Sequence, residues 1–350
     1  MKKVICFVVL CSMLLFTSGV FAGEYTGKKL SLKFASEETE RDFMTIWGQK
    51  FADEMKAWSD GKIDITVYPY GTLGDTRDIN ELCQIGVIEF VFSDFAWISS
   101  FVPQAQVLAL HYLWPREKTQ EVLNWVVKNG KTMGMLEEKF RNNGMVPLAI
   151  TWEGWQWITT KKPIYSLEDM KGLKLRVMSS KLLVENYKAY GASPTPMQYG
   201  EVYGALQMGV IDAQANPIAG DYSMKFYEVT DQFVQIYAEP FLSIPTVNMQ
   251  FFDSLPKNAQ EKIRNFWLDA IMPSADWIDE LNASDMRQMK KEKPDLEFTR
   301  LSDEKIAAFK ERAKTVYPKF SEIGGDDAQK ILDTLILDIE NAKKALGVSH

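Results

Sequence analysis

An arginine and an asparagine stand where strand-like segments of this sequence end. Arg176 lies within residues 173–177, and Asn216 directly follows residues 210–215. In α/β proteins, ligands collect beyond the carboxyl ends of strands and near helix N-termini, whose free amides favour anions. The Arg176 guanidinium can hold a carboxylate in a two-bonded fork, and the Asn216 amide can bond a carboxylate or a hydroxyl. On spacing alone, a surface arginine bridging an acid and a simple Asn-Pro turn remain the competing interpretations.

Sequence patterns that mark enzymes are absent. We find no G-x-S-x-G, H-E-x-x-H, C-x-x-C, G-x-G-x-x-G, Walker or EF-hand motif. The only histidines are His111 and the terminal His350, too few for histidine-based catalysis or a multi-histidine metal site. Glu168 and Asp169 are typical of a solvated helix cap. We therefore expect no catalytic residue, no metal and no cofactor, and we favour a binding role.

The segments that must position Arg176 and Asn216 alternate between strands and helices. Residues 30–34 and 63–67 alternate apolar with polar side chains, whereas the apolar residues of 43–58 recur at helical spacing. A helix over 75–85 and an apolar strand over 87–92 complete a βαβαβ series. A second series of this kind begins after Gly144, and the chain beyond residue 255 is mostly helical. The pattern predicts two α/β units, each a mainly parallel sheet flanked by helices.

The first 22 residues have the pattern of a secretory signal peptide. Lys2 and Lys3 precede an uncharged apolar run, and small residues lead up to Ala22, after which we expect cleavage. The remaining chain holds 38 basic and 47 acidic residues, a formal charge of −9, which disfavours nucleic acid as a partner. It keeps only Cys83, so no internal disulfide can form. These features predict a periplasmic protein of roughly two domains.

Several motifs, in order and spacing, resemble the solute-binding subunits of TRAP (tripartite ATP-independent periplasmic) transporters. They are MKGLKLRV, YGASPTPMQYGEVYGALQMGVIDAQANP, GKIDITVYPYGTLGDTRDINELCQIGVIEF and FVPQAQVLALHYLW. The resemblance covers nearly all of the chain after the signal peptide. It implies a two-lobed clamshell with a long helix spanning both lobes. The expected parts are a first lobe of residues 23–152 plus about 243–280, a second lobe of 153–242 plus about 281–325, and a C-terminal helix of about 326–350 packing on the lobes.

The resemblance also implies roles for individual residues. Arg176 matches the family arginine that pairs with the substrate carboxylate, and Asn216 matches the asparagine at the end of a later strand. Tyr199 falls where an aromatic residue commonly packs on the ligand. Ser179 falls where a small polar side chain often faces the cleft. Loops near Ala35 and Ser93 are expected to close on the ligand from the first lobe.

Gln156 departs from the family pattern in a way that bears on the substrate. Many acid-binding members resemble this chain but carry a second arginine at that place, whereas glutamine carries no charge. We therefore favour a monocarboxylate over a dicarboxylate, unless a nearby lysine compensates. The candidate lysines are Lys161, Lys162 and Lys174.

Aromatic and acidic side chains refine the expected ligand. Trp152 and Trp155 lie beside Gln156, and flat apolar walls suit an aryl or indole acid, although packing in the core is the competing interpretation. Asp94, next to Ser93, could accept an ammonium group, which keeps an amino acid open as a ligand.

The predicted function is capture of a small organic acid by lobe closure, followed by delivery to the TRAP membrane permease subunits. The alternatives are a dicarboxylate or amino-acid ligand, and a binding subunit that serves as a sensor. We expect a monomer, with a dimer as the alternative.

Overall fold

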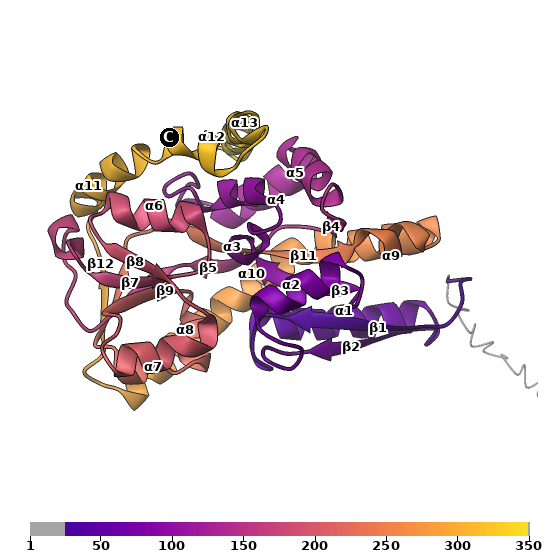
Figure 1. Ribbon diagram of the computed structural model, residues 1–350, viewed down its shortest axis with the longest axis horizontal. Coiled ribbons are helices and arrows are strands. Elements are labelled where there is room, and N and C mark those ends of the chain that lie inside the picture. Colours follow the sequence, from indigo (N-terminus) through magenta and orange to yellow (C-terminus); the bar gives the residue numbers. More distant parts are fainter. Residues whose placement is uncertain (1–24, 349–350) are drawn as a thin grey trace, which may run out of the picture.

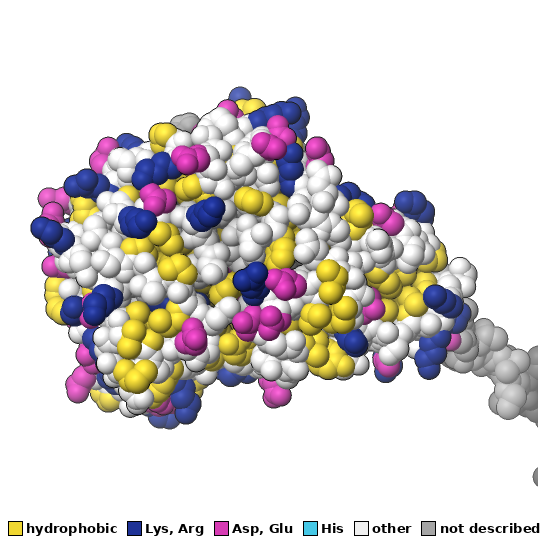
Figure 2. Space-filling model, viewed as in Figure 1, with side chains coloured by type: hydrophobic (Ala, Val, Ile, Leu, Met, Phe, Trp, Pro, Cys, Tyr) yellow, Lys and Arg dark blue, Asp and Glu magenta, His cyan; other side chains and the backbone are white. Residues whose placement is uncertain are grey.

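Two six-stranded sheets, each covered by helices, form the two lobes of the molecule in the computed structural model (Figure 1). The structure describes residues 25–348, so the predicted signal peptide and its cleavage after Ala22 lie outside the described part. Within residues 25–348, no helix is both long and apolar enough to cross a membrane. Acidic and basic side chains are interspersed over the face seen in Figure 2.

The first sheet builds the first lobe, with the strand order β2-β1-β3-β11-β4 and with β5 also paired to β11. Its strands are β1 (Leu30–Ser36), β2 (Ile63–Tyr68), β3 (Phe90–Asp94), β4 (Met145–Pro147), β5 (Thr151–Trp155) and β11 (Pro240–Asn248). β1 runs parallel to β2 and β3, in a register that sets Phe34 opposite Phe90. Alternation along β1 sends Leu32 and Phe34 into the core.

The second sheet builds the second lobe, with the strand order β12-β10-β6-β9-β7-β8. Its strands are β6 (Trp157–Thr160), β7 (Lys174–Val177), β8 (Ser193–Pro196), β9 (Ala213–Asn216), β10 (Gln232–Gln235) and β12 (Glu297–Arg300). β7 runs parallel to both β8 and β9, which brings Arg176 opposite Gln214. The carboxyl ends of β7 and β9 therefore meet at one edge of the lobe.

The two-lobed α/β fold is the expected one, and both sheets are mixed, with antiparallel pairings beside the parallel ones. The chain enters the second sheet through β6 and returns to the first through β11. Both strands run antiparallel to every neighbour with which they pair. The antiparallel pairings thus arise where the chain crosses between lobes. A count of βα units along the sequence does not reveal them.

Helices cover both sheets and bury an aromatic core. Those packed around the first sheet are α1 (Phe43–Trp58), α2 (Thr76–Gln84), α3 (Phe95–Ile98), α4 (Thr119–Asn129), α5 (Thr132–Arg141) and α9 (Met249–Ser254). Those around the second sheet are α6 (Lys181–Ala189), α7 (Val202–Gln207), α8 (Ile218–Ser223) and α11 (Asp303–Lys314). α12 (Phe320–Ile323) leads to α13 (Ala328–Leu346), which packs on α4 and α5 (Figure 1). Cys83, on the inner face of α2, is buried, in agreement with a core role.

One long helix, α10 (Lys257–Glu292), contacts both lobes. Near its start, Trp267 packs on Phe34 of the first lobe, with ring centroids 6.2 Å apart. Near its end, Met289 belongs to a buried cluster with Trp157 and Phe233 of the second lobe. The expected spanning helix is thus confirmed, and it ties the lobes together.

Two predicted strands begin later than the apolar pattern indicates. Val87 and Val210 were expected to start strands, but they lie 48% and 54% exposed in turns before β3 and β9. Each follows a glycine in the left-handed region, Gly86 at φ 78° and Gly209 at φ 72°. The amide of each valine bonds back into the preceding helix, as in a helix-terminating motif.

Candidate ligand-binding site

A small cavity lies between the lobes, and we call it the interlobe cavity. Its volume is about 20 Å³. The first lobe contributes the ends of β1 and β3 with α2 and α3, and the second contributes the ends of β7 and β9 with α8. The lining residues are Glu37, Glu38, Thr76, Asp94, Trp97, Arg176, Met178, Tyr199, Asn216, Pro217, Gly220 and Phe241. The carboxyl ends of strands from both sheets therefore face one another here.

Arg176 is buried in this cavity with an incomplete set of partners. Its side chain is 1% exposed, and its Nε donates to the Met197 carbonyl at 3.0 Å. Nη1 has no hydrogen-bond partner, and the guanidinium makes no ion pair with any described carboxylate. Burial lowers the pKa of Arg176 to about 10, so the group remains cationic at neutral pH. A buried cation without a full set of partners is costly, and an anion docked on its free edge would offset that cost.

Two carboxyl groups of the first lobe face the same cavity. Asp94 is fully buried at the end of β3, where its Oδ1 accepts from the Ala96 and Trp97 amides of α3. Glu37 follows β1, and its carboxyl group lies close enough to Asp94 for their charges to interact. Oδ2 of Asp94 and Oε2 of Glu37 have no hydrogen-bond partner among residues 25–348. Burial raises the pKa of Asp94 to about 6. Burial and then the charge of Asp94 raise the pKa of Glu37 well above its usual value.

Further buried carboxyl groups stand near this pair. Glu38 accepts from the Met44 amide of α1 at 2.6 Å. Burial and then the charge of Asp42 raise the pKa of Glu38 to about 8. Burial and then the charge of Glu38 also raise the pKa of Glu153 well above its usual value. The first-lobe side of the cavity is therefore acidic, and a bound cation would favour ionisation of its carboxyl groups.

The second lobe adds an amide and a phenol to the cavity. Asn216 is 4% exposed at the end of β9, and its Nδ2 donates to Oε1 of Gln214. Tyr199 donates from its hydroxyl to the Gly220 carbonyl at 3.1 Å and packs edge-on against Tyr70. Of the residues singled out from the sequence, the cavity thus brings together Arg176, Asn216, Tyr199 and Asp94.

Three other predicted residues lie away from the cavity wall. Ser93 is buried and donates to Oδ1 of Asn80 at 2.9 Å. Ser179 is exposed at the lobe boundary, and Met178 lines the cavity instead. Gln156 points toward the hinge, the two segments 155–157 and 235–240 with which the chain crosses between lobes. Its Nε2 donates to Oε1 of Glu239 at 2.9 Å. The absent second arginine at position 156 therefore carries less weight for the ligand than the sequence indicated.

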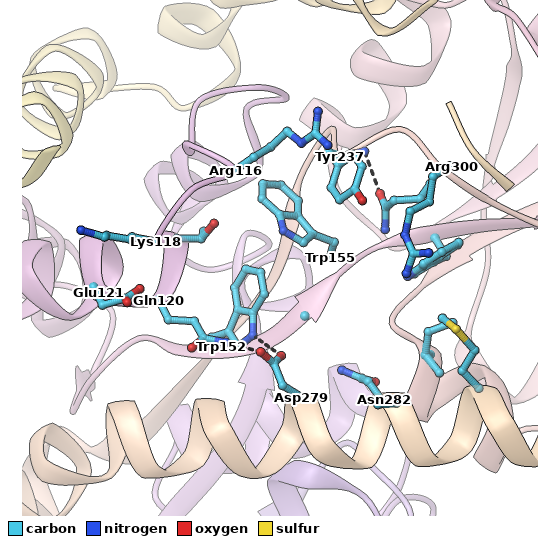
Figure 3. A pocket seen from close by; sticks show the side chains of 17 residues that line it. Arg116, Lys118, Gln120, Glu121, Trp152, Trp155, Tyr237, Asp279, Asn282 and Arg300 are labelled. Carbon is cyan, nitrogen blue, oxygen red and sulfur yellow. Dashed lines mark hydrogen bonds between the residues drawn. The ribbon is translucent and has the colours of Figure 1, made fainter. Parts of the chain in front are cut away.

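The tryptophans expected beside the ligand line a different hollow. Trp152 and Trp155 face a groove at the hinge, shown in Figure 3, which shares no lining residue with the interlobe cavity. The candidate lysines are also absent from the cavity wall. Lys162 pairs with Asp212, while Lys161 and Lys174 line no part of the cavity. Aromatic walls are nevertheless present in the cavity, from Trp97 and Phe241.

Sequence reasoning missed Glu37 and Glu38, which follow β1 within the segment SEETE. The signal was available, because the same rule that selected Arg176 and Asp94 applies to the end of any strand in a parallel pair. Phe241 was also missed. Phe241 lies in β11, which returns to the first lobe from far along the chain.

Contacts between the lobes close the cavity. The Gly200 amide of the second lobe donates to the Tyr70 hydroxyl of the first at 3.0 Å. Arg41, between β1 and α1, pairs with Asp285 of α10 at 2.8 Å. A cavity of about 20 Å³ holds about one water molecule, so the described conformation is closed. An organic ligand can enter only when the lobes separate.

Comparison with known proteins gives a consistent result. Residues 34–323 match the model of bacterial extracellular solute-binding protein, family 7. The ectoine/5-hydroxyectoine-binding periplasmic protein UehA of Ruegeria pomeroyi is 36% identical over 88% of this chain and 90% of its own length. The ectoine-binding periplasmic protein TeaA of Halomonas elongata is 33% identical over 88% and 89% of the two chains.

Solved structures agree with the sequence relatives. The ectoine-binding protein of the Halomonas elongata TeaABC TRAP transporter superposes with a TM-score of 0.84, covering 89% of this chain and 100% of that one at 33% identity. A TRAP solute-binding protein of Desulfovibrio salexigens with bound orotic acid gives 0.83, covering 89% and 99% at 26% identity. The chain therefore belongs to family 7 of the bacterial extracellular solute-binding proteins, the periplasmic solute-binding subunits of TRAP transporters.

Proposed function

We propose that this protein captures a compact zwitterion that carries one carboxylate and one cationic group, of the ectoine type. The observation that carries the proposal is the arrangement of unmatched charge in the interlobe cavity. Arg176 offers a free guanidinium edge from the second lobe, while Glu37 and Asp94 offer free carboxyl oxygens from the first. A zwitterion between them places its carboxylate against Arg176 and its cationic group against Glu37 and Asp94.

The charge balance of the cavity disfavours a dicarboxylate. Arg176 is the only cationic residue among the lining side chains, which also include Glu37, Glu38 and Asp94. A second ligand carboxylate would have to lie against these acids, at a cost in repulsion and desolvation. The monocarboxylate preference expected from Gln156 is retained, but it now rests on the acidic first-lobe wall.

Ectoine fits this chemistry. It is a small ring with one carboxylate and one delocalised amidinium cation, and two relatives that match nearly the whole chain carry ectoine in their names. The faces of Trp97, Tyr199 and Phe241 supply apolar walls for such a ring. In this proposal an aromatic acid is not required, because the tryptophans that suggested one line the hinge groove.

In the proposed capture mechanism, the ligand contacts the charged wall of the second lobe first and that of the first lobe after closure. The ligand carboxylate docks on Arg176 and Asn216 in the open state. The first lobe then closes and brings Glu37 and Asp94 to the cationic group, so that the closed state gains contacts that the open state lacks. Subunits of this family work with TRAP membrane permeases, and we propose delivery to such a permease from the periplasm.

Calorimetric titration of the chain from residue 23 with ectoine, 5-hydroxyectoine, succinate and cyclohexanecarboxylate tests the proposal. We expect saturable binding of the two zwitterions. Succinate tests how much a second carboxylate weakens binding. Cyclohexanecarboxylate is a ring acid without a cationic group, so it tests how much that group contributes to affinity. Tighter binding of succinate than of ectoine would refute the zwitterion assignment and leave the family assignment intact.

A thermal-shift series supplies an independent reading. Ligand at one hundred times its dissociation constant stabilises the folded state by about 2.7 kcal/mol, a shift of roughly 2–4 °C for this size. Intact ectoine recovered after overnight incubation would distinguish binding from turnover.

A further inference from the structure

The hinge groove has a volume of about 560 Å³, and the proposed function does not use it. It is built on both segments with which the chain crosses between lobes, 155–157 and 235–240. In Figure 3, Trp155 and Tyr237 stand side by side above α10, with Arg116 and Arg300 at the upper rim. Its volume falls within the range typical of small-molecule sites.

Aromatic rings form the wall of the groove. Trp155 packs edge-on against Trp152 and against Tyr237, with centroids 5.7 Å apart in both pairs. Trp155 and Tyr237 are only partly buried, so they present ring surface to the groove. Tyr237 also has a φ of 50°, which is rare for a residue with a bulky side chain and costs backbone free energy. Strained residues of this kind cluster at functional sites.

Cationic groups stand at the rim of these rings. Arg116 lies over the Tyr237 ring at 3.9 Å and pairs with Asp303. Arg300, at the end of β12, lies over the Trp157 ring at 5.2 Å. Arg300 makes no ion pair with any carboxylate in residues 25–348, and its side chain is exposed. The guanidinium of Arg300 is therefore free to take an anion while its stem remains against an aromatic face.

The acid on the floor of the groove is already engaged. Oδ1 of Asp279 accepts from Trp152 Nε1 at 2.9 Å, and Oδ2 accepts from Gln120 at 2.6 Å (Figure 3). Burial raises the pKa of this carboxyl group. The other acid of the lining, Glu121, lies on the opposite side of the groove from Arg300 in Figure 3. On the Arg300 side, the free polar capacity is thus cationic, and it lies beside flat apolar surface.

We propose that the hinge groove is a second binding site, which takes a planar aromatic carboxylate. The ring packs on Trp155 and Tyr237, and the carboxylate pairs with Arg300. This site is separate from the interlobe cavity, since the two hollows share no lining residue. A molecule bound there contacts elements of both lobes, β5 from the first and β12 from the second.

Titration with indole-3-acetate, followed by ligand-observed NMR and calorimetry, tests this site. We expect saturable one-to-one binding in the natural chain and in Arg176→Ala, because the cavity anchor takes no part. Arg300→Gln is expected to weaken binding about tenfold, the loss of one charge-assisted pair. Arg287→Gln, an equal change of charge at an exposed position of α10 outside the groove, is the matched control and should leave binding unchanged.

Indole-3-acetamide separates the ring from the charge. It should bind about tenfold more weakly than indole-3-acetate to the natural chain and equally well to Arg300→Gln. Absence of saturable binding would overturn the proposal. So would binding that is lost in Arg176→Ala and unaffected in Arg300→Gln, since that result would place the probe in the interlobe cavity. Neither result bears on ectoine binding.

Discussion

The hinge groove is larger than the interlobe cavity, but the cavity contains more buried charged groups without partners. The cavity measures about 20 Å³ and the groove about 560 Å³. The cavity, however, holds a fully buried guanidinium and two carboxyl groups with unmatched atoms, whereas Asp279 on the floor of the groove has its partners. Size alone would select the groove as the principal site. The free-energy cost of buried, unmatched charge selects the cavity.

This difference shows what closure does in a two-lobed binding protein. A closed cavity is small because the lobes pack around whatever it holds, and its chemistry is found in the unmatched atoms of its wall. The open groove is exposed to water, which satisfies its rim charges at little cost. Ligand binding should therefore be strong and charge-selective in the cavity, and weaker and dominated by stacking in the groove.

Replacing Arg176 with alanine should have the largest effect. Two charge-assisted hydrogen bonds to the ligand carboxylate would be lost, at about 1.5–3 kcal/mol each, so the dissociation constant for ectoine should rise at least 100-fold. The ligand-free protein should not lose stability, because a buried cation with incomplete partners is removed. Calorimetry and thermal unfolding measure the two effects.

Arg176→Lys is the conservative control for this prediction. Lysine keeps the charge but cannot form the planar fork, so ectoine binding should recover only in part. If Arg176→Ala binds ectoine with an affinity within fivefold of that of the natural chain, Arg176 does not anchor the ligand.

Replacing Glu37 with glutamine should have the next largest effect and should depend on the ligand. We expect ectoine binding to weaken about 10–100-fold, because the cationic group loses one carboxylate partner. Binding of cyclohexanecarboxylate, which has no cation, should stay the same or improve. Glu40→Gln is the matched control, since Glu40 lies three residues further along and is exposed. Equal losses for both ligands would indicate general damage to the wall instead of charge recognition.

The sequence predicted one side of this cavity better than the other, for a physical reason. Arg176 and Asn216 end strands of one continuous βαβ series, so their meeting at one edge follows from local order along the chain. The acidic wall needs Glu37 to meet Asp94 across the pairing of β1 with β3, more than 50 residues apart. Without that pairing, SEETE is indistinguishable from a solvated acidic turn.

Gln156 and the tryptophans show what the local sequence pattern could not predict, namely the direction in which each side chain points. Successive side chains of a strand point to opposite faces, and no local pattern says which face meets the ligand. Gln156 turns to Glu239, which lies on the returning crossover 83 residues later. Trp155 turns to Tyr237 of the same crossover. Both outcomes depend on how the two crossing segments pair. This pairing also made the sheets mixed.

The stability of the ligand-free protein should decrease moderately as the pH rises. Burial raises the pKa of Glu38 to about 8 and that of Asp94 to about 6, so the folded state binds protons more tightly than the unfolded chain. The stabilising effect of this protonation is complete below about pH 4 and is lost as the pH rises toward 8. Between pH 5.5 and 8, the melting temperature of the ligand-free protein should fall by roughly a few degrees.

Ectoine affinity should change in the opposite direction, because the cationic group binds the ionised carboxylates. We expect it to rise about tenfold over the same interval, during which the charges of ectoine itself do not change. Glu38→Gln should flatten the dependence of stability on pH. An affinity that falls as the pH rises would place the cationic group elsewhere.

Replacing Tyr70 with phenylalanine should have the smallest effect, because it alters closure and leaves the charged walls intact. The substitution removes the acceptor for the Gly200 amide and keeps the ring that packs on Tyr199. A neutral hydrogen bond contributes about 0.5–1.5 kcal/mol, so ectoine affinity should fall about 2–10-fold. Since the bond exists only when the lobes meet, the loss should appear in the dissociation rate. Stopped-flow fluorescence measures this rate, and Tyr68→Phe, the same change two residues earlier at the end of β2, is the control. A slower association rate with an unchanged dissociation rate would mean that Tyr70 acts on the open state, so closure would depend on the ligand charges alone.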